Sequence, residues 1–105
     1  MVRAHIWVKK KEGQTAEEFG RYWLEQHAPI ARDGYENLKG YTVALVTRVP
    51  DGQHAPYDGV ATLTWDDRDG FRADMASDAA GRGTEDLRNF SSAFGLVFVE
   101  ETVVA

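Results

Sequence analysis

The chain has 105 residues, of which 43% are hydrophobic and 28% are charged, and its formal net charge is −5. This balance predicts one globular domain and excludes a disordered chain, and the negative charge opposes nucleic acid as a partner. The absence of cysteine excludes disulfides and thiolate chemistry. We expect a cytoplasmic protein without a membrane segment, because no stretch approaches the ~20 apolar residues of a bilayer span and no signal-peptide core follows Met1.

The first predicted elements are a strand and a helix. In residues 2–9 every second side chain is apolar (Val2, Ala4, Ile6 and Val8), and this period of two is typical of a strand. Thr15 and Glu18 have the spacing of a capping box, so a helix should begin there. Pro29 should kink or end this helix, because proline lacks an amide hydrogen and disfavours helical geometry before it. Residues at spacings of four, four and three form an apolar stripe on the helix, namely Phe19, Trp23, His27 and Ile30.

Two strands and a loop are predicted in the middle of the chain. Residues 39–48 and 59–65 are rich in β-branched and aromatic types, which favours strands. Residues 49–56 lie between them and carry proline, glycine and aspartate, which is the chemistry of turns. We therefore expect two strands joined by an irregular loop.

The last third of the chain predicts two helices and a final strand. Asp66 or Asp67 can cap a second helix. The glycines of residues 81–83 are expected to break the chain, and Thr84 to cap a short third helix. Residues 94–104 should form the last strand. The resulting order predicts an α+β, ferredoxin-like βαββαβ fold, with a four-stranded antiparallel sheet carrying its helices on one face.

The sheet face without helices has no obvious cover. The last strand is apolar on both faces, with Leu96 and Phe98 on one and Val97 and Val99 on the other. An apolar face larger than roughly a few hundred Å² is rare on a monomer. We therefore expect a homodimer, a dimeric α+β barrel whose paired sheets enclose a small-molecule pocket. The alternative is that the third helix and loops cover this face within one chain.

One helical motif resembles a known family. Residues 19–29 read F-G-R-Y-W-L-E-Q-H-A-P, which resembles the F-x-x-Y-W-x-x-x-H-x-P signature of the EthD domain family. Residues 57–60, 65–66 and 99–101 resemble later landmarks of that family, so the resemblance implies a single EthD-like domain over 1–105. The wider superfamily includes monooxygenases, polyketide cyclases, decarboxylases, dehydratases and haem proteins, so the fold narrows the function poorly.

A second resemblance concerns polar residues. The segment 54–57, together with His27 and Tyr41, is similar to the pattern of methylmuconolactone methylisomerase in aromatic-ring catabolism. That resemblance implies a pocket cysteine which this chain lacks, and Leu63 is expected in its place. The chemistry therefore cannot be transferred whole.

Three residues are predicted to be catalytic. His27 is the expected acid/base, because an imidazole with an unperturbed pKa of ~6.5 suits proton transfer near neutral pH. Tyr41 is expected to polarise a substrate oxygen and His54 to assist or close the site, with the ligand beside the loop 49–57. Each has a simpler interpretation: a histidine in an apolar stripe is often a core residue, a strand tyrosine often only packs, and a loop histidine is often exposed.

Further residues are predicted to bind the substrate. His5 and Trp7 lie opposite Ile6 on the first strand, so they face either the cavity or the dimer interface. The three histidines lack close ligand spacing, so neither a metal nor a cofactor is expected. The predicted substrate-binding residues are His5, Trp7, Trp23 and Leu63.

The leading hypothesis is a cofactor-independent isomerase, cyclase or lyase. It would transfer a proton next to the carbonyl group of an aromatic-derived, lactone or polyketide-like compound. One alternative is a non-catalytic small-molecule binding or accessory protein of an oxidative catabolic or biosynthetic pathway. Another is a haem-using or cofactor-free oxygenase.

Overall fold

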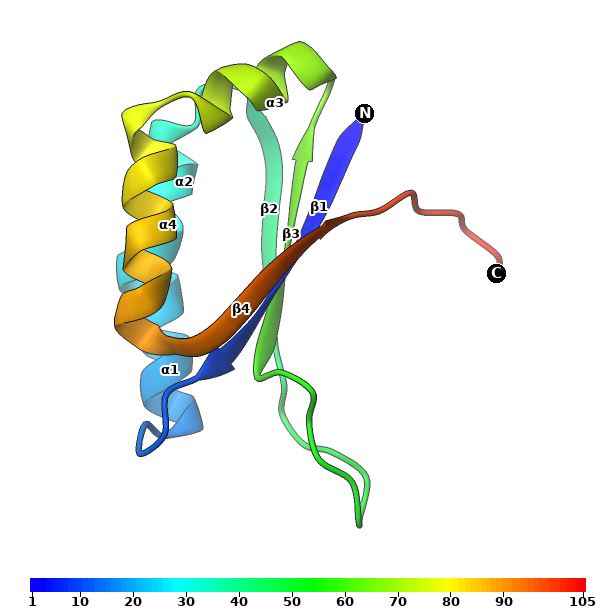
Figure 1. Ribbon diagram of the computed structural model, residues 1–105. Helices are drawn as coiled ribbons and strands as arrows, with labels where there is room; N and C mark the ends of the chain where they lie inside the picture. Colours follow the sequence, from blue (N-terminus) through cyan, green and yellow to red (C-terminus); the bar gives the residue numbers. More distant parts are fainter.

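A computed structural model describes residues 1–105 and places every helix on one face of a single sheet (Figure 1). No helix combines the length and the apolar character needed to cross a membrane. The elements in chain order are β1 (Val2–Lys10), α1 (Ala16–Tyr22), the π-helical turn η1 (Trp23–His27), α2 (Ala28–Gly34), β2 (Leu38–Leu45), β3 (Gly59–Trp65), α3 (Arg68–Met75), α4 (Asp78–Phe90) and β4 (Ser91–Phe98).

The sheet has the strand order β2-β3-β1-β4, and all neighbouring strands are antiparallel. This is the predicted ferredoxin-like βαββαβ arrangement. One row across the sheet joins Tyr41, Leu63, Ala4 and Phe98 as register partners. Ala4 and Leu63 are buried, so this row faces the helices.

The core between sheet and helices is built from aromatic side chains. Phe90 of α4 lies 5.6 Å from Phe19 and 5.8 Å from Trp23, measured between ring centroids. All three residues are at most 1% exposed. Full burial of such a side chain contributes about 1.5–3 kcal/mol, so this cluster fixes α1, η1 and α4 against one another.

The first helical segment begins as predicted, and α1 gives way to the π-helical turn η1 directly before α2 and Pro29. The Thr15 hydroxyl accepts a hydrogen bond from the Glu18 amide, and the Glu18 carboxylate accepts one from the Thr15 amide, each at 3.0 Å. At η1 the backbone hydrogen bonds span five residues instead of four, and the amide of Ala28 donates to the Trp23 carbonyl. Pro29 therefore falls in the first turn of α2, where its missing amide hydrogen costs little. Turns of this kind are frequent at functional sites.

The predicted break at residues 81–83 is wrong, because α4 runs without interruption from Ser77, its N-cap, to Phe90. Thr84 is inside the helix, and its hydroxyl donates to the carbonyl of Ala80. The close approach of α2 to α4 is at Gly34, where a Cβ would lie 2.5 Å from the Cβ of Ala79.

The opposite face of the sheet is not covered by this chain (Figure 1). No separate third helix crosses to it, so the one-chain alternative does not occur. Trp7 lies over Gly95 on this face, where a Cβ would come within 2.5 Å of the indole. Val97 of β4 is 49% exposed. Strand β4 ends at Phe98, earlier than predicted; the amide of Val99 still donates to the carbonyl of Arg3, and the end of the chain then leaves the sheet (Figure 1).

Candidate functional site

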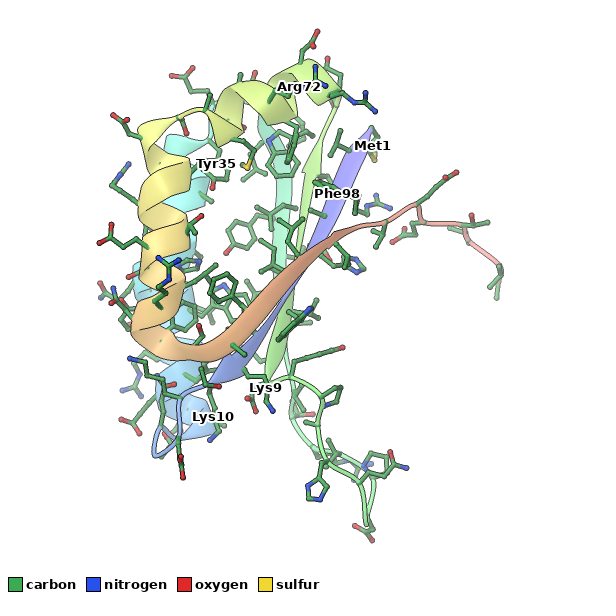
Figure 2. All side chains as sticks on the ribbon, viewed as in Figure 1. Met1, Lys9, Lys10, Tyr35, Arg72 and Phe98 are labelled. Carbon is green, nitrogen blue, oxygen red and sulfur yellow. The ribbon has the colours of Figure 1, made fainter.

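A cavity of about 200 Å³ lies between the sheet and the helices of one chain. It is larger than the ~150 Å³ engineered apolar cavity that binds benzene. Its lining is mostly apolar and contains no Lys, Arg, Asp or Glu. Figure 2 shows aromatic and aliphatic side chains projecting into this space from both layers. The polar side chains that line it are His27, Tyr35, Tyr41 and Thr84.

His27 ends the π-helical turn and is joined to Asp86 of α4. Its Nδ1 lies 2.8 Å from Oδ2 of Asp86, and the two side chains are only 12% and 14% exposed. The other carboxylate oxygen accepts hydrogen bonds from the Tyr22 hydroxyl at 2.7 Å and from the Asn89 amide at 2.9 Å. The ring of Phe90 lies 4.8 Å from the imidazole. The orientation of the imidazole is therefore fixed from several sides.

This contact leaves the second ring nitrogen of His27 open. The carboxylate of Asp86 only accepts, so Nδ1 carries the hydrogen and Nε2 of the neutral ring has a free lone pair. Nε2 has no hydrogen-bond partner in the protein. Every fully buried side-chain nitrogen or oxygen does have a partner, so Nε2 is not fully buried. Nε2 therefore keeps accessible surface in a residue that lines the cavity.

The protonation states suit a base. Burial lowers the pKa of His27, and the hydrogen bond and charge of Asp86 only partly oppose this. Burial raises the pKa of Asp86, but hydrogen bonds from Tyr22, Asn89 and His27 outweigh it, so that pKa lies below its ordinary value. Near neutral pH the pair is thus a neutral imidazole beside an ionised carboxylate, and the imidazole can accept a proton.

Tyr41 supplies a hydroxyl on the sheet side of the cavity. Its oxygen accepts a hydrogen bond of 3.1 Å from Nε1 of Trp23, so its own hydrogen is free to donate. Burial raises the pKa of Tyr41, and the bond from Trp23 opposes this only in part. The phenol is therefore a neutral donor.

The predicted site residues fall into two groups. His27, Tyr41 and Leu63 line the cavity, and the buried Trp23 supports Tyr41 beneath it. The cavity lies within one chain, whereas the sequence suggested a pocket enclosed by paired sheets. Besides Trp23, three predicted residues are not among the lining. His5 and Trp7 lie on the outer face of β1, and His54 is exposed in the loop between β2 and β3.

Asp86 and Tyr35 were not predicted from the sequence. Asp86 is four residues before Phe90, so a carboxylate sits on the buried side of a helix, which is a usable signal. This signal was missed because the helix was predicted to start at Thr84. Asp86 would then lie in the first turn, where the helix dipole alone explains an acidic residue.

Comparison with known proteins gives a family and a fold. Residues 11–93 match the model of the EthD domain. Comparison with curated proteins finds no match. An EthD family protein from Bacillus halodurans is similar in structure, with a TM-score of 0.77 and 19% identity over 97% of this chain and 100% of that chain.

Two further solved structures share the fold. A dimeric ferredoxin-like protein of unknown function from Thermobifida fusca has a TM-score of 0.66 and 17% identity over 93% of this chain and 88% of its own. SnoaB, a cofactor-independent oxygenase from Streptomyces nogalater, has a TM-score of 0.63 and 22% identity over 99% of this chain and 97% of its own. At these identities the likeness concerns the fold.

Proposed function

The chain belongs to the EthD domain family, and we propose that it is a cofactor-independent isomerase, cyclase or lyase. It moves a proton next to the carbonyl group of a small aromatic-derived, lactone or polyketide-like compound. The observation that carries this proposal is the contact of 2.8 Å between His27 Nδ1 and Asp86 Oδ2 in the wall of an apolar cavity. An oriented, neutral imidazole there is a general base.

The proposed reaction begins with proton abstraction. Nε2 of His27 takes a proton from the carbon next to the carbonyl group, so a C–H bond breaks and an N–H bond forms. The electron pair of the C–H bond moves to the carbonyl oxygen and gives an enolate. Tyr41 donates a hydrogen bond to that oxygen, and the carboxylate of Asp86 stabilises the imidazolium. The imidazolium then returns the proton to another carbon or to a leaving group.

The cavity lining supports a substrate that is neutral at its reacting end. No Lys or Arg lines the cavity, so a buried carboxylate would have no cationic partner there. The similarity to methylmuconolactone methylisomerase is the least supported version of the proposal. His54 is exposed in a loop, and the chain has no cysteine to match the one that this resemblance implies.

Deuterium exchange tests the proposed function even when the reaction product is unidentified. Acetophenone and a methyl-substituted butenolide, each incubated with the protein in deuterium oxide, should incorporate deuterium next to the carbonyl faster than in buffer alone. Mass spectrometry measures the incorporation. Binding of either compound without accelerated exchange would instead support the non-catalytic binding protein.

A cofactor-independent oxygenase is the second candidate, because one structural neighbour, SnoaB, is described as a cofactor-independent oxygenase. The same proton abstraction produces an electron-rich carbanion, which can react with dioxygen in place of a proton. Oxygen consumption coupled to loss of the compound supports this candidate. Exchange with no oxygen uptake supports the isomerase, cyclase or lyase.

We also propose that the protein is a homodimer in which the outer sheet faces pack together. Trp7, seated on Gly95, and the half-exposed Val97 give this face an apolar centre that the chain itself leaves open. The Thermobifida fusca neighbour is described as dimeric, which supports the proposal. In such a dimer each chain keeps its own cavity, because the cavity lies on the opposite side of the sheet.

A further inference from the structure

We propose that Tyr35 is a second hydrogen-bond donor to the substrate oxygen, so that Tyr35 and Tyr41 together form a two-phenol site for an oxyanion. The inference rests on the proposed function, since it concerns the oxygen of the same carbonyl group. It adds a catalytic residue that neither the helix signature nor the strand alternation marks.

Tyr35 follows the last residue of α2, on the sheet side of the helices (Figure 2). Its ring lies 6.4 Å from that of Trp65, and its hydroxyl would be 3.6 Å from a Cβ at Gly83. The Tyr35 hydroxyl has no hydrogen-bond partner in the protein. Every fully buried side-chain oxygen does have a partner, so this hydroxyl is not fully buried. The Tyr35 hydroxyl therefore reaches open space from a residue that lines the cavity. It is an unused donor.

Tyr41 faces the same cavity from β2. Trp23, which is 1% exposed, fixes the Tyr41 oxygen by donating to it, and this leaves the Tyr41 hydrogen for a ligand. Burial raises the pKa of Tyr35, and the charge that an ionised Tyr41 would carry raises it further. Both residues line the same cavity, and both hydroxyls remain protonated donors near neutral pH.

Helix α4 contacts both Tyr35 and His27. Gly83 lies beside the Tyr35 hydroxyl, and Asp86 holds His27. Residue 86 is three positions after residue 83 in the helix, a rise of about 4.5 Å along its axis. A carbonyl compound can therefore present its carbon to Nε2 and its oxygen to the phenols. The cavity offers that oxygen no Lys or Arg, so the phenols are its charge-stabilising donors.

Binding of para-nitrophenolate tests the oxyanion site directly, because this anion carries its charge on an aromatic oxygen and its absorbance reports binding. The wild-type protein should bind it. Tyr35→Phe and Tyr41→Phe should each weaken binding about 10- to 100-fold, the usual effect of losing one hydrogen bond to a charged group. Tyr57→Phe is the matched control, since Tyr57 is not in the cavity lining, and it should bind as the wild type does.

Nitrobenzene corrects for changes of cavity shape, because it fills the same space without an oxyanion. Its affinity should be the same in all four proteins, so the ratio of the two affinities isolates the hydrogen bonds. Unchanged phenolate binding by Tyr35→Phe, beside weakened binding by Tyr41→Phe, would overturn the role of Tyr35 and leave the proposed function intact. A wild-type protein that binds nitrobenzene but not the phenolate would also overturn it. Accelerated deuterium exchange is measured separately, so its absence would reject only the proposed function.

Discussion

His27 Nδ1 lies 2.8 Å from Asp86 Oδ2, and this contact joins the π-helical turn η1 to the middle of α4. Two residues 59 positions apart thus meet beside the cavity. The carboxylate is held in turn by Tyr22 and Asn89, so the imidazole is positioned by the fold and does not depend on the ligand for its orientation. This relationship leads to the first two predictions.

Asp86→Asn should slow proton transfer and change the ionisation of His27. Asp86 raises the pKa of His27 against the larger effect of burial, so removing its charge should lower that pKa further. Nitrogen NMR of the imidazole should show a lower midpoint of titration and a smaller share of the Nδ1–H tautomer. Glu85→Gln, the same charge change at the exposed neighbouring position, should alter neither. An unchanged titration in Asp86→Asn would contradict the positioning role.

The free energy of unfolding should depend on pH through His27. Its pKa is lowered in the folded state, so the unfolded chain binds the proton more readily. Stability is therefore complete above the unfolded pKa of ~6.5 and falls as the pH drops through the folded pKa. Urea unfolding of the wild type at pH values on either side of ~6.5 measures this loss, and His27→Asn should lose less over the same interval. Equal losses of unfolding free energy in both proteins would show that His27 is not the cause. Asp86 does not contribute in this interval, because its pKa lies below its ordinary value and it titrates only at lower pH.

Two glycine substitutions test the continuity and packing of α4. Gly81→Ala should stabilise the protein by about 0.5–1 kcal/mol, because alanine favours a helix interior and nothing lies within 4 Å of its new Cβ. Gly34→Ala should destabilise it by about 1–3 kcal/mol, because its Cβ would lie 2.5 Å from the Cβ of Ala79. Thermal unfolding of both variants gives the comparison. A destabilised Gly81→Ala would indicate that the helix is broken there, as the sequence alone suggested.

The outer sheet face should be the dimer interface. Val97→Lys places an ammonium on this face, and burying it without a partner costs several kcal/mol, so the dimer should dissociate. Light scattering at micromolar concentration gives the mass. Val103→Lys is the matched control, since Val103 is 81% exposed beyond β4, and its mass should equal that of the wild type. A monomeric wild-type protein would contradict the barrel.

Local patterns predicted most of the fold. The strand predicted over residues 59–65 coincides with β3, and the capping box at Thr15 starts α1 as expected, because both depend on neighbours in sequence. The break predicted at residues 81–83 is the clear error. A glycine costs only about 1 kcal/mol in a helix interior, and the apolar residues that α4 buries on either side of the two glycines outweigh that cost.

The candidate site was predicted less completely than the fold. His27 could be selected from its place in the apolar stripe and the helix signature, and Tyr41 from the second resemblance. Asp86 and Tyr35 could not, because their roles depend on which helix face meets η1 and on where α2 ends. His54 was predicted from the resemblance to methylmuconolactone methylisomerase, and its loop is not part of the cavity wall.

The most direct test of the proton-transfer account is deuterium exchange by His27→Asn. Asparagine keeps the polarity and approximate volume of the imidazole but cannot shuttle a proton. The account predicts a folded variant with a nearly unchanged melting temperature and an exchange rate reduced by about 10²- to 10⁴-fold, for whichever of the carbonyl compounds the wild type exchanges. A variant that melts several degrees lower while its exchange per folded molecule survives would show that His27 is structural, and would contradict the account.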